Sequence, residues 1–208
     1  MAEPPESVVF ILDDAPAVRD ALESLLQSVG QSSLSYATAE AFLKAERPEV
    51  PACLVLDVRL PERSGLELQR DLAVAGIDLP VIVITGHGDI PMSVAAMKAG
   101  AIDFLTKPFR DQDLLDAIQR AIRQDRERRA ERAELVVLQA RHAALTPRER
   151  EVMAMLADGL ANKQIAAALD LKEVTVKVHR AQVMRKLEAK SLPALVRFAD
   201  RLKAAAQG

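Results

Sequence analysis

The chain has 208 residues, half of them hydrophobic, and a formal net charge of −2 at pH 7, so it is long and apolar enough to form two modest globular domains. No apolar run approaches the ~20 residues that span a bilayer, the acidic N-terminus lacks the basic and apolar regions of a signal peptide, and the single Cys53 rules out an internal disulfide or a Cys-based zinc cluster. We therefore expect a soluble cytoplasmic protein with no membrane partner.

Four short apolar runs each end in a residue that is suited to phosphate chemistry. Continuous apolar runs between helical patterns are typical of buried parallel strands. Because ligands of an open parallel sheet bind at the carboxyl ends of its strands, we expect the polar residues to meet at one edge. In chain order the runs are 8–12 followed by Asp13 and Asp14, 53–56 followed by Asp57, 81–84 followed by Thr85, and 102–106 followed by Lys107.

Segments with the 3.6-residue period of amphipathic helices separate these runs. Glycine follows three of the segments, as is common where a helix ends. The alternation predicts an α/β fold, a doubly wound five-stranded parallel sheet with right-handed crossovers. The predicted helices cover residues 16–29, 39–45, 64–75 and 91–99, and a weak edge strand is expected near residues 33–35.

A segment without glycine or proline, residues 110–145, predicts one unbroken helix of ~50 Å at 1.5 Å per residue. Its first part has apolar positions for packing on the sheet, whereas residues 123–134 are almost entirely charged. Asp125 and Arg129 have the spacing of an ion pair one turn apart. Two interpretations are open: a semi-rigid linker that also self-associates through residues 135–138, or a frayed charged tether.

Charge is distributed unevenly along the chain. Residues 1–110 hold 9 Lys and Arg against 16 Asp and Glu, a net charge of −7, whereas residues 146–208 hold 12 against 7, a net charge of +5. The acidic part suits a cation site, and the basic end suits a polyanion.

The C-terminal segment predicts a small bundle of four helices. Thr146 suits a helix N-cap, Pro147 suits the first helical position, and Glu149 makes the first turn acidic. Two later helices separated by a short turn have the pattern of a helix-turn-helix. The helices are expected over residues 147–158, 162–169, 173–187 and 192–203.

The helix at residues 173–187 combines apolar with polar and basic side chains. The side chains available for packing are Val174, Val178, Met184 and Leu187. Those available for a DNA groove are Thr175, Lys177, Arg180, Gln182 and Arg185.

The chemistry of the predicted edge follows from its charges. Three carboxylates repel one another unless a cation lies between them, and an oxygen-rich site with few protein ligands suits Mg²⁺. Asp57, alone at the end of a central strand, is the predicted nucleophile that forms an acyl phosphate. Thr85 would donate a hydrogen bond to one phosphate oxygen, and Lys107 would pair with another.

The motifs LDD at 12–14, DVRLP at 57–61, TGHGD at 85–89 and KPF at 107–109 resemble, in this order and spacing, the receiver domain of two-component response regulators. The resemblance covers residues 7–122 and implies that a sensor histidine kinase phosphorylates Asp57. It also implies that Asp14, Asp57 and the backbone carbonyl of Arg59 ligate Mg²⁺, and that Asp13 acts through water.

The same resemblance implies a cis peptide between Lys107 and Pro108 and a signal that passes from Thr85 to Phe104. Phe104 is either a switch that swings inward when Thr85 moves toward phosphate or a permanently buried core residue. Two positions depart from the family's pattern, Ala15 in place of an aspartate and Glu62 in place of a glycine.

A second set of motifs, LTPREREV at 145–152, NKQIA at 162–166, TVKVHR at 175–180 and MRKL at 184–187, resembles the LuxR-type DNA-binding domain of the NarL/FixJ class of response regulators, FixJ-like regulators above all. The resemblance covers residues 143–204 and implies that residues 173–187 form the recognition helix. The implied contacts to promoter DNA are Asn162, Lys163, Thr175, Lys177, Val178, His179, Arg180, Ala181 and Lys186.

These features predict a transcription factor that is controlled by phosphorylation and is not a turnover enzyme. The expected domains are a receiver at 1–122, a helical linker at 123–142 and a helix-turn-helix domain at 143–208. We expect a homodimer on phosphorylation and contact with RNA polymerase. Activation through release of a hidden recognition helix is equally compatible with the sequence.

The alternative is an enzyme, a phosphohydrolase similar to the haloacid dehalogenases, which also place Asp, Thr and Lys at strand ends with Mg²⁺. The nucleophile of those enzymes belongs to an Asp-x-Asp after the first strand, whereas this chain has Asp13, Asp14 and Ala15 there. A phosphate-binding loop with glycines and Lys-Ser or Lys-Thr is absent from the sequence, which argues against an ATPase.

Overall fold

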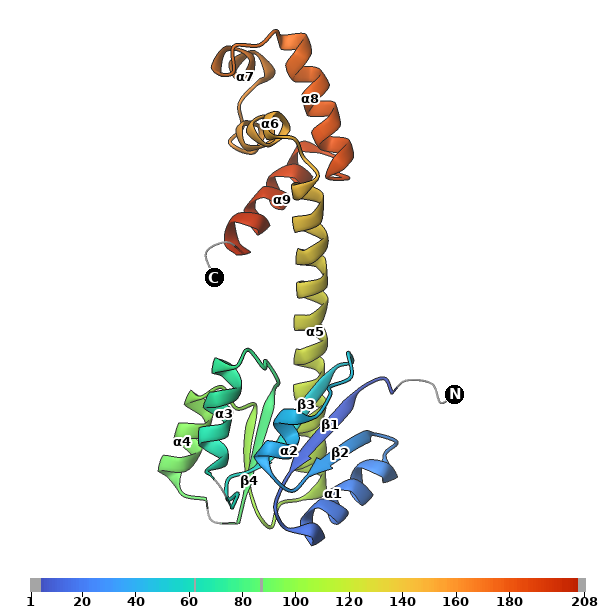
Figure 1. Ribbon diagram of the computed structural model, residues 1–208, viewed down its shortest axis with the longest axis vertical. Helices are drawn as coiled ribbons and strands as arrows, with labels where there is room; N and C mark the ends of the chain where they lie inside the picture. The colour runs from blue at the N-terminus through green and yellow to red at the C-terminus, as the bar shows by residue number, and fades with distance from the viewer. Residues whose placement is uncertain (1–4, 62, 87, 206–208) are drawn as a thin grey trace. The chain divides into compact units, whose positions relative to one another are not determined.

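The computed structural model describes residues 5–61, 63–86 and 88–205, in an N-terminal unit (Met1–Arg129) and a C-terminal unit (Ala130–Gly208). The sheet of the N-terminal unit consists of β1 (Val8–Leu12), β2 (Ser32–Tyr36), β3 (Ala52–Asp57), β4 (Val81–Thr85) and β5 (Asp103–Thr106). Its strands pair in parallel in the order β2-β1-β3-β4-β5 (Figure 1). The predicted five-stranded, doubly wound α/β fold is confirmed.

The three central strands, β1, β3 and β4, are buried along their whole length. Successive side chains of a strand point to opposite faces, so a strand that is apolar throughout requires cover on both faces. The register pairs Leu12 with Leu56 and Thr85 with Thr106. Residues just beyond these pairs therefore reach the same edge of the sheet.

Helices cover both faces of the sheet (Figure 1). They are α1 (Pro16–Ser28), α2 (Ala39–Lys44), α3 (Gly65–Val74), α4 (Ile90–Lys98) and α5 (Asp111–Ala143). The first four lie within one residue of their predicted bounds. Phe10 packs in the core beneath α2, α3 and α4, whereas its neighbour Ile11 packs in the core beneath α1 and the first part of α5.

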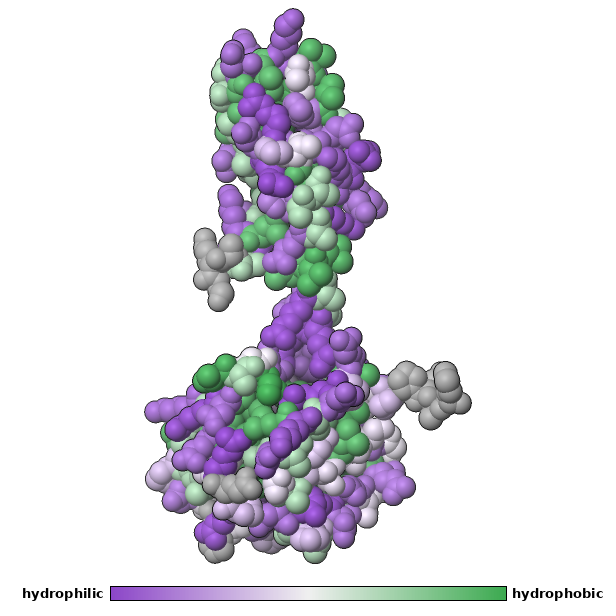
Figure 2. Space-filling view, in the orientation of Figure 1, coloured by the Kyte–Doolittle hydropathy of each residue, from purple (hydrophilic) through white to green (hydrophobic). Residues whose placement is uncertain are grey.

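The long helix α5 begins in the N-terminal unit and ends in the C-terminal unit. It is one residue shorter at its start and two residues shorter at its end than the sequence predicts. Its middle is drawn almost entirely in the colours of hydrophilic residues (Figure 2), as expected from its charged sequence. No helix within the described residues is long and apolar enough to cross a bilayer.

One residue of this charged stretch is not solvated. Asp125 is only 1% exposed, and its carboxylate accepts hydrogen bonds from the backbone N–H of Ala52 (2.9 Å), from Arg128 (2.5 Å) and from Arg129 (2.7 Å). The guanidinium of Arg128 also bonds Asp78. The predicted ion pair of Asp125 with Arg129 is confirmed, and Asp125 additionally fastens α5 to the first residue of β3. We call these contacts of Asp125 the β3 anchor.

The C-terminal unit contains the predicted helices, here α6 (Pro147–Ala157), α7 (Asn162–Ala168), α8 (Glu173–Lys186) and α9 (Leu192–Ala205). The side chain of Thr146 caps α6 by accepting the N–H of Glu149, whose carboxylate accepts the N–H of Thr146 in return, a capping box. Together with the end of α5, the helices enclose one apolar core that includes Leu138, Val152 and Leu195.

The packing face of α8 differs from the prediction. Val174 and Val178 are exposed, and the buried residues are Val176, Val183 and Leu187. The helix has apolar residues on two sides, and the side that packs is the one that faces α6 and α7. Leu187 and the partly buried Met184 are confirmed as packing residues, whereas Val174 and Val178 are not.

Candidate functional sites

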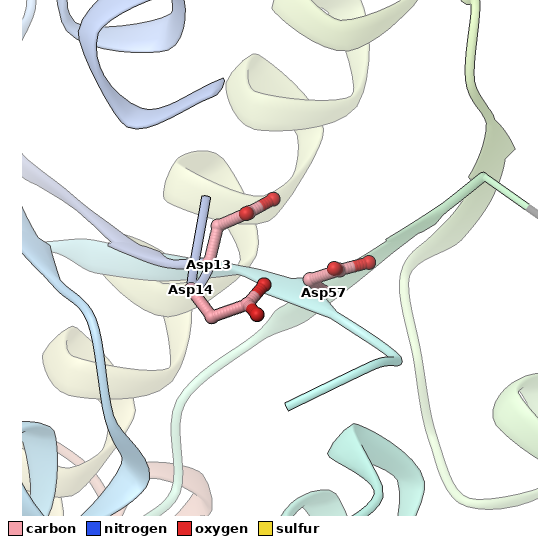
Figure 3. Close-up of side chains that lie close together, drawn as sticks. All are labelled: Asp13, Asp14 and Asp57. Atoms are coloured by element: carbon pink, nitrogen blue, oxygen red, sulfur yellow. The ribbon is translucent and has the colours of Figure 1, made fainter. Parts of the chain in front are cut away.

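Three carboxylates gather at the carboxyl ends of β1 and β3, as the sequence predicts (Figure 3). Asp13 and Asp14 follow β1, and Asp57 is the last residue of β3. Each offers one oxygen, and these three oxygens lie within 4.8 Å of one another. The cluster is composed entirely of hard oxygen donors, the ligand type that Mg²⁺ prefers.

Lys107 lies beside this cluster. Its Nζ is 2.7 Å from Oδ2 of Asp13 and 3.6 Å from Oδ1 of Asp57. The backbone N–H of Lys107 donates to the carbonyl of Thr85 (2.7 Å), which ties the end of β5 to the end of β4. The predicted cis peptide between Lys107 and Pro108 is present. The five residues predicted from strand ends thus come from neighbouring strands of one sheet edge: Asp13, Asp14, Asp57, Thr85 and Lys107.

Asp57 is held in an electrostatically unfavourable position. It is 7% exposed, and its buried Oδ1 has no hydrogen-bond partner among the described residues. Burial raises the pKa of Asp57, and the charges of Asp13 and Asp14 raise it further, against the opposing effects of Lys107 and of a hydrogen bond from the backbone of Arg59. A carboxylate with a bare oxygen and two acidic neighbours favours the binding of a cation, so the residues present fit Mg²⁺.

Two further residues, neither of them predicted from the sequence, shape the site. Nη1 of Arg19 donates to the carbonyls of Asp13 (2.7 Å) and Asp14 (3.0 Å), so the first turns of α1 hold the backbone of the acidic pair. Gly65 lies so close to the chain that a Cβ there would come within 2.2 Å of the carbonyl oxygen of Asp57. The sequence signal for Arg19 is a basic residue placed one turn inside a helix that follows two acids; Gly65 has no such signal.

Thr85 and Phe104 lie on adjacent strands. Thr85 is fully buried at the end of β4, and Phe104 is half-buried and packs against the core beneath α2, α3 and α4. A Cβ at Gly88, in the loop after β4, would come within 2.9 Å of the Phe104 ring and 2.6 Å of the Thr106 methyl group. Gly88 is therefore in close contact with the predicted switch residue. Glu62 lies outside the described residues.

The predicted DNA contacts of the C-terminal unit lie on α7 and α8. Nη1 of Arg180 donates to Oδ1 of Asn162 (3.3 Å) and so joins the two helices. The exposed members of the set are Lys163, Lys177, Val178 and Ala181, and the half-buried ones are Asn162, Thr175, His179, Arg180 and Lys186.

Lys186 already has partners inside the unit. Its Nζ donates to Oε2 of the buried Glu149 (2.6 Å) and to the carbonyl of Ala144 (3.2 Å). These bonds connect the end of α8 to the start of α6. The hydrogen bond from Lys186, together with one from the N–H of Thr146, lowers the pKa of Glu149. Contact of Lys186 with DNA stays a prediction, and its position gives it a structural role as well.

Both halves of the chain match known families. Residues 9–119 match the model of the response regulator receiver domain, and residues 143–199 match that of the bacterial regulatory proteins of the luxR family. Nodulation protein W of Bradyrhizobium diazoefficiens is 48% identical over 95% of this chain and 87% of its own length. Transcriptional regulatory protein FixJ of Rhizobium meliloti is 47% identical over 92% and 94%, respectively.

Solved structures agree with these matches. The response regulator StyR superposes with a TM-score of 0.86 at 46% identity, over 94% of this chain and 99% of that one. Full-length FixJ from B. japonicum gives a TM-score of 0.58 at 43% identity, over 95% and 97%. These matches do not support the phosphohydrolase alternative.

Proposed function

Since the chain belongs to the response regulators that join a receiver domain to a LuxR-type DNA-binding domain, we propose that phosphorylation of Asp57 by a sensor histidine kinase controls its binding to promoter DNA. The observation that carries the proposal is the meeting of Asp13, Asp14, Asp57 and Lys107 at one sheet edge, in a chain that also has a basic helix-turn-helix unit.

Asp57 carries the phosphoryl group. Its carboxylate oxygen bonds to phosphorus while the bond from phosphorus to the kinase histidine nitrogen breaks, which leaves an acyl phosphate on Asp57 and an imidazole that takes up a proton from solvent. Lys107, 3.6 Å from Oδ1 of Asp57, offsets negative charge on the phosphoryl oxygens, and the hydroxyl of Thr85 donates a hydrogen bond to one of them. The product is the phosphorylated protein. Later hydrolysis of the acyl phosphate on Asp57 does not make the chain a turnover enzyme.

Magnesium is the proposed cofactor. Asp14, Asp57 and the backbone carbonyl of Arg59 would hold it. Both oxygens of Asp13 already accept hydrogen bonds, one from the N–H of Ala15 and one from Lys107, which supports a role for Asp13 through water. Mg²⁺, when bound, offsets the charge on the carboxylates and the phosphoryl oxygens.

Dimerisation is the proposed link from phosphate to DNA. The side chains of Ile90, Val94 and Met97 are exposed, and their spacing places them on one side of α4, next to β5. Two receivers that pair through this face would present two α8 helices to half-sites about one helical turn, ~34 Å, apart, and the second contact would raise affinity through effective concentration. RNA polymerase at the promoter is the further proposed partner.

The test uses the full chain with acetyl phosphate as the phosphoryl donor. We expect one phosphate per chain when Mg²⁺ is present and no label in excess chelator. We also expect a higher sedimentation mass and tighter binding to a duplex selected from a random pool. Steady release of phosphate over many turnovers would instead favour an enzyme, and unchanged mass together with unchanged DNA affinity would contradict the proposed control by dimerisation.

Two lysines of α8 should behave differently when replaced by alanine. Lys177 is exposed, so Lys177→Ala should weaken binding to the selected duplex by about 1–3 kcal/mol and alter base preference, with no change in thermal stability. Lys186→Ala removes the partner of the buried Glu149 and should lower the melting temperature of the C-terminal unit. Melting curves and duplex titrations of both variants make the comparison; a stable Lys186→Ala variant would contradict the structural role.

A further inference from the structure

The side of α8 that faces away from its own core contains a short row of apolar residues. Val174 is 64% exposed and Val178 is 56% exposed, and Ala181 is exposed as well. At 3.6 residues per turn, positions 174, 178 and 181 line up along one side of the helix. The buried Val176 and Val183 lie on the opposite side. We call the row of Val174, Val178 and Ala181 the α8 crest.

The fold gives no reason for valines on this crest. Valine is a poorer helix former than alanine, lysine or glutamate, and its exposed methyl groups stay in contact with water. Single exposed apolar side chains are ordinary on protein surfaces. Two of them one turn apart, at the centre of the outward side of the helix, indicate a surface that meets an apolar group of a ligand.

Exposed basic side chains accompany the crest. Lys177 and Arg185 are exposed on α8, and Lys163 is exposed on α7; Lys177 also pairs with Glu173 (3.5 Å). An apolar row on a helix that carries exposed basic groups suits a ligand with negative charge beside an apolar feature. Duplex DNA has that character, because phosphates line the groove in which the base edges lie.

The chemistry of valine limits what the crest can read. Its methyl groups neither donate nor accept hydrogen bonds, and the one apolar group that standard bases present in the major groove is the C5-methyl of thymine. Residues four apart on a helix are separated by ~6 Å along its axis, whereas successive base pairs rise by ~3.4 Å. Val174 and Val178 therefore have the spacing to meet methyl groups about two base steps apart.

We propose that Val174, acting with Val178, is a specificity-determining residue that reads thymine methyl groups in the operator. The inference rests on the proposed function, because it requires that α8 enter the major groove. It adds a residue outside the set of DNA contacts that the family resemblance implies. This pair would recognise the C5-methyl group itself and form no hydrogen bond with the base. A 5-methylcytosine at the same position would therefore keep the contact.

The test separates the methyl group from the rest of the base. A duplex selected by the full chain is remade with uracil in place of each thymine in turn, which removes one methyl group and keeps every hydrogen bond. We expect a loss of affinity of about three- to fivefold at one or two positions. Val174→Ala should abolish the response to uracil at one of them, and Val178→Ala should abolish it at the other, about two base steps away.

Val74→Ala is the matched control, because Val74 is 89% exposed and lies at the end of α3 in the N-terminal unit. It should keep the full response to uracil. The inference is overturned if uracil is neutral at every position, or if Val174→Ala keeps the wild-type response, and in either case the proposed function stands. Absence of any sequence preference would overturn the proposed function and this inference together.

Discussion

Replacing Asp57 by Asn should abolish labelling by acetyl phosphate and leave the fold intact. The amide of Asn has nearly the same shape as the carboxylate but is a poor nucleophile, and it removes one negative charge from the proposed metal site. The measurement is the stoichiometry of phosphate per chain after incubation with Mg²⁺. The control is Asp20→Asn, which changes an exposed aspartate on α1 and should label normally.

The same substitution should stabilise the metal-free protein at neutral pH. The pKa of Asp57 is raised mainly by burial, so the folded protein favours the protonated, neutral carboxyl. The stability that this preference adds is fully present below the ordinary pKa of Asp and is lost as the pH rises through the folded-state pKa. Asn carries no such loss. In chelator at pH 7 the N-terminal unit of Asp57→Asn should therefore melt at a higher temperature than that of the wild type, and Mg²⁺ should raise its melting temperature less. Wild-type labelling of the variant would refute the assignment of Asp57.

Replacing Asp125 by Ala should destabilise the N-terminal unit by about 3 kcal/mol. The change removes the β3 anchor, and so leaves the N–H of Ala52 without its acceptor and Arg128 and Arg129 without their shared carboxylate. The measurement is the urea midpoint of the transition that shifts with Mg²⁺, which identifies the N-terminal unit. Asp116→Ala, on the exposed side of the same helix, is the control and should stay within about 0.5 kcal/mol of the wild type.

The effect of Asp125 should depend on pH in the opposite sense to that of Asp57. Burial acts to raise the pKa of Asp125, but hydrogen bonds from Arg129, the Ala52 N–H and Arg128 outweigh it and leave the pKa lowered. The stabilising effect is therefore present above the ordinary pKa and is lost as the pH falls through the folded-state pKa. The advantage of the wild type over Asp125→Asn should shrink in acid. An advantage that is constant with pH would show that the ionised carboxylate has no part in the anchor.

The receiver half was predictable because one periodicity dominates each of its elements. The runs ending at Asp13, Asp57 and Thr85 are apolar throughout, as the strands of a parallel sheet covered on both faces are. The rule that ligands bind at the carboxyl edge of such a sheet then brings the polar residues together. The glycines after α1, α3 and α4 marked helix ends to within one residue, because Gly30, Gly76 and Gly100 all have the positive φ that such ends need.

What could not be predicted depends on contacts between distant parts of the chain. On α8, helical spacing places Val174 and Val178 on one side and Val176 and Val183 on the other, and either pair could pack against a core. The placement of α6 and α7 decides that Val176 and Val183 are the buried pair. Asp125 lies in a stretch of charged residues, a sequence that is typical of a solvent-exposed helix. Its burial follows from one backbone N–H, at Ala52, that is 73 positions away in the sequence.

The β3 anchor also makes a single backbone proton informative. The amide hydrogen of Ala52 is bonded to the carboxylate of Asp125 and lies at the opposite end of β3 from Asp57. Its exchange with deuterated solvent requires that this bond open, so its protection factor reports the attachment of α5 to the sheet in every state of the protein. A peptide that begins several residues before Ala52 therefore gives a mass-spectrometric reading of whether an event at Asp57 reaches the far end of its own strand, without any label introduced into the chain.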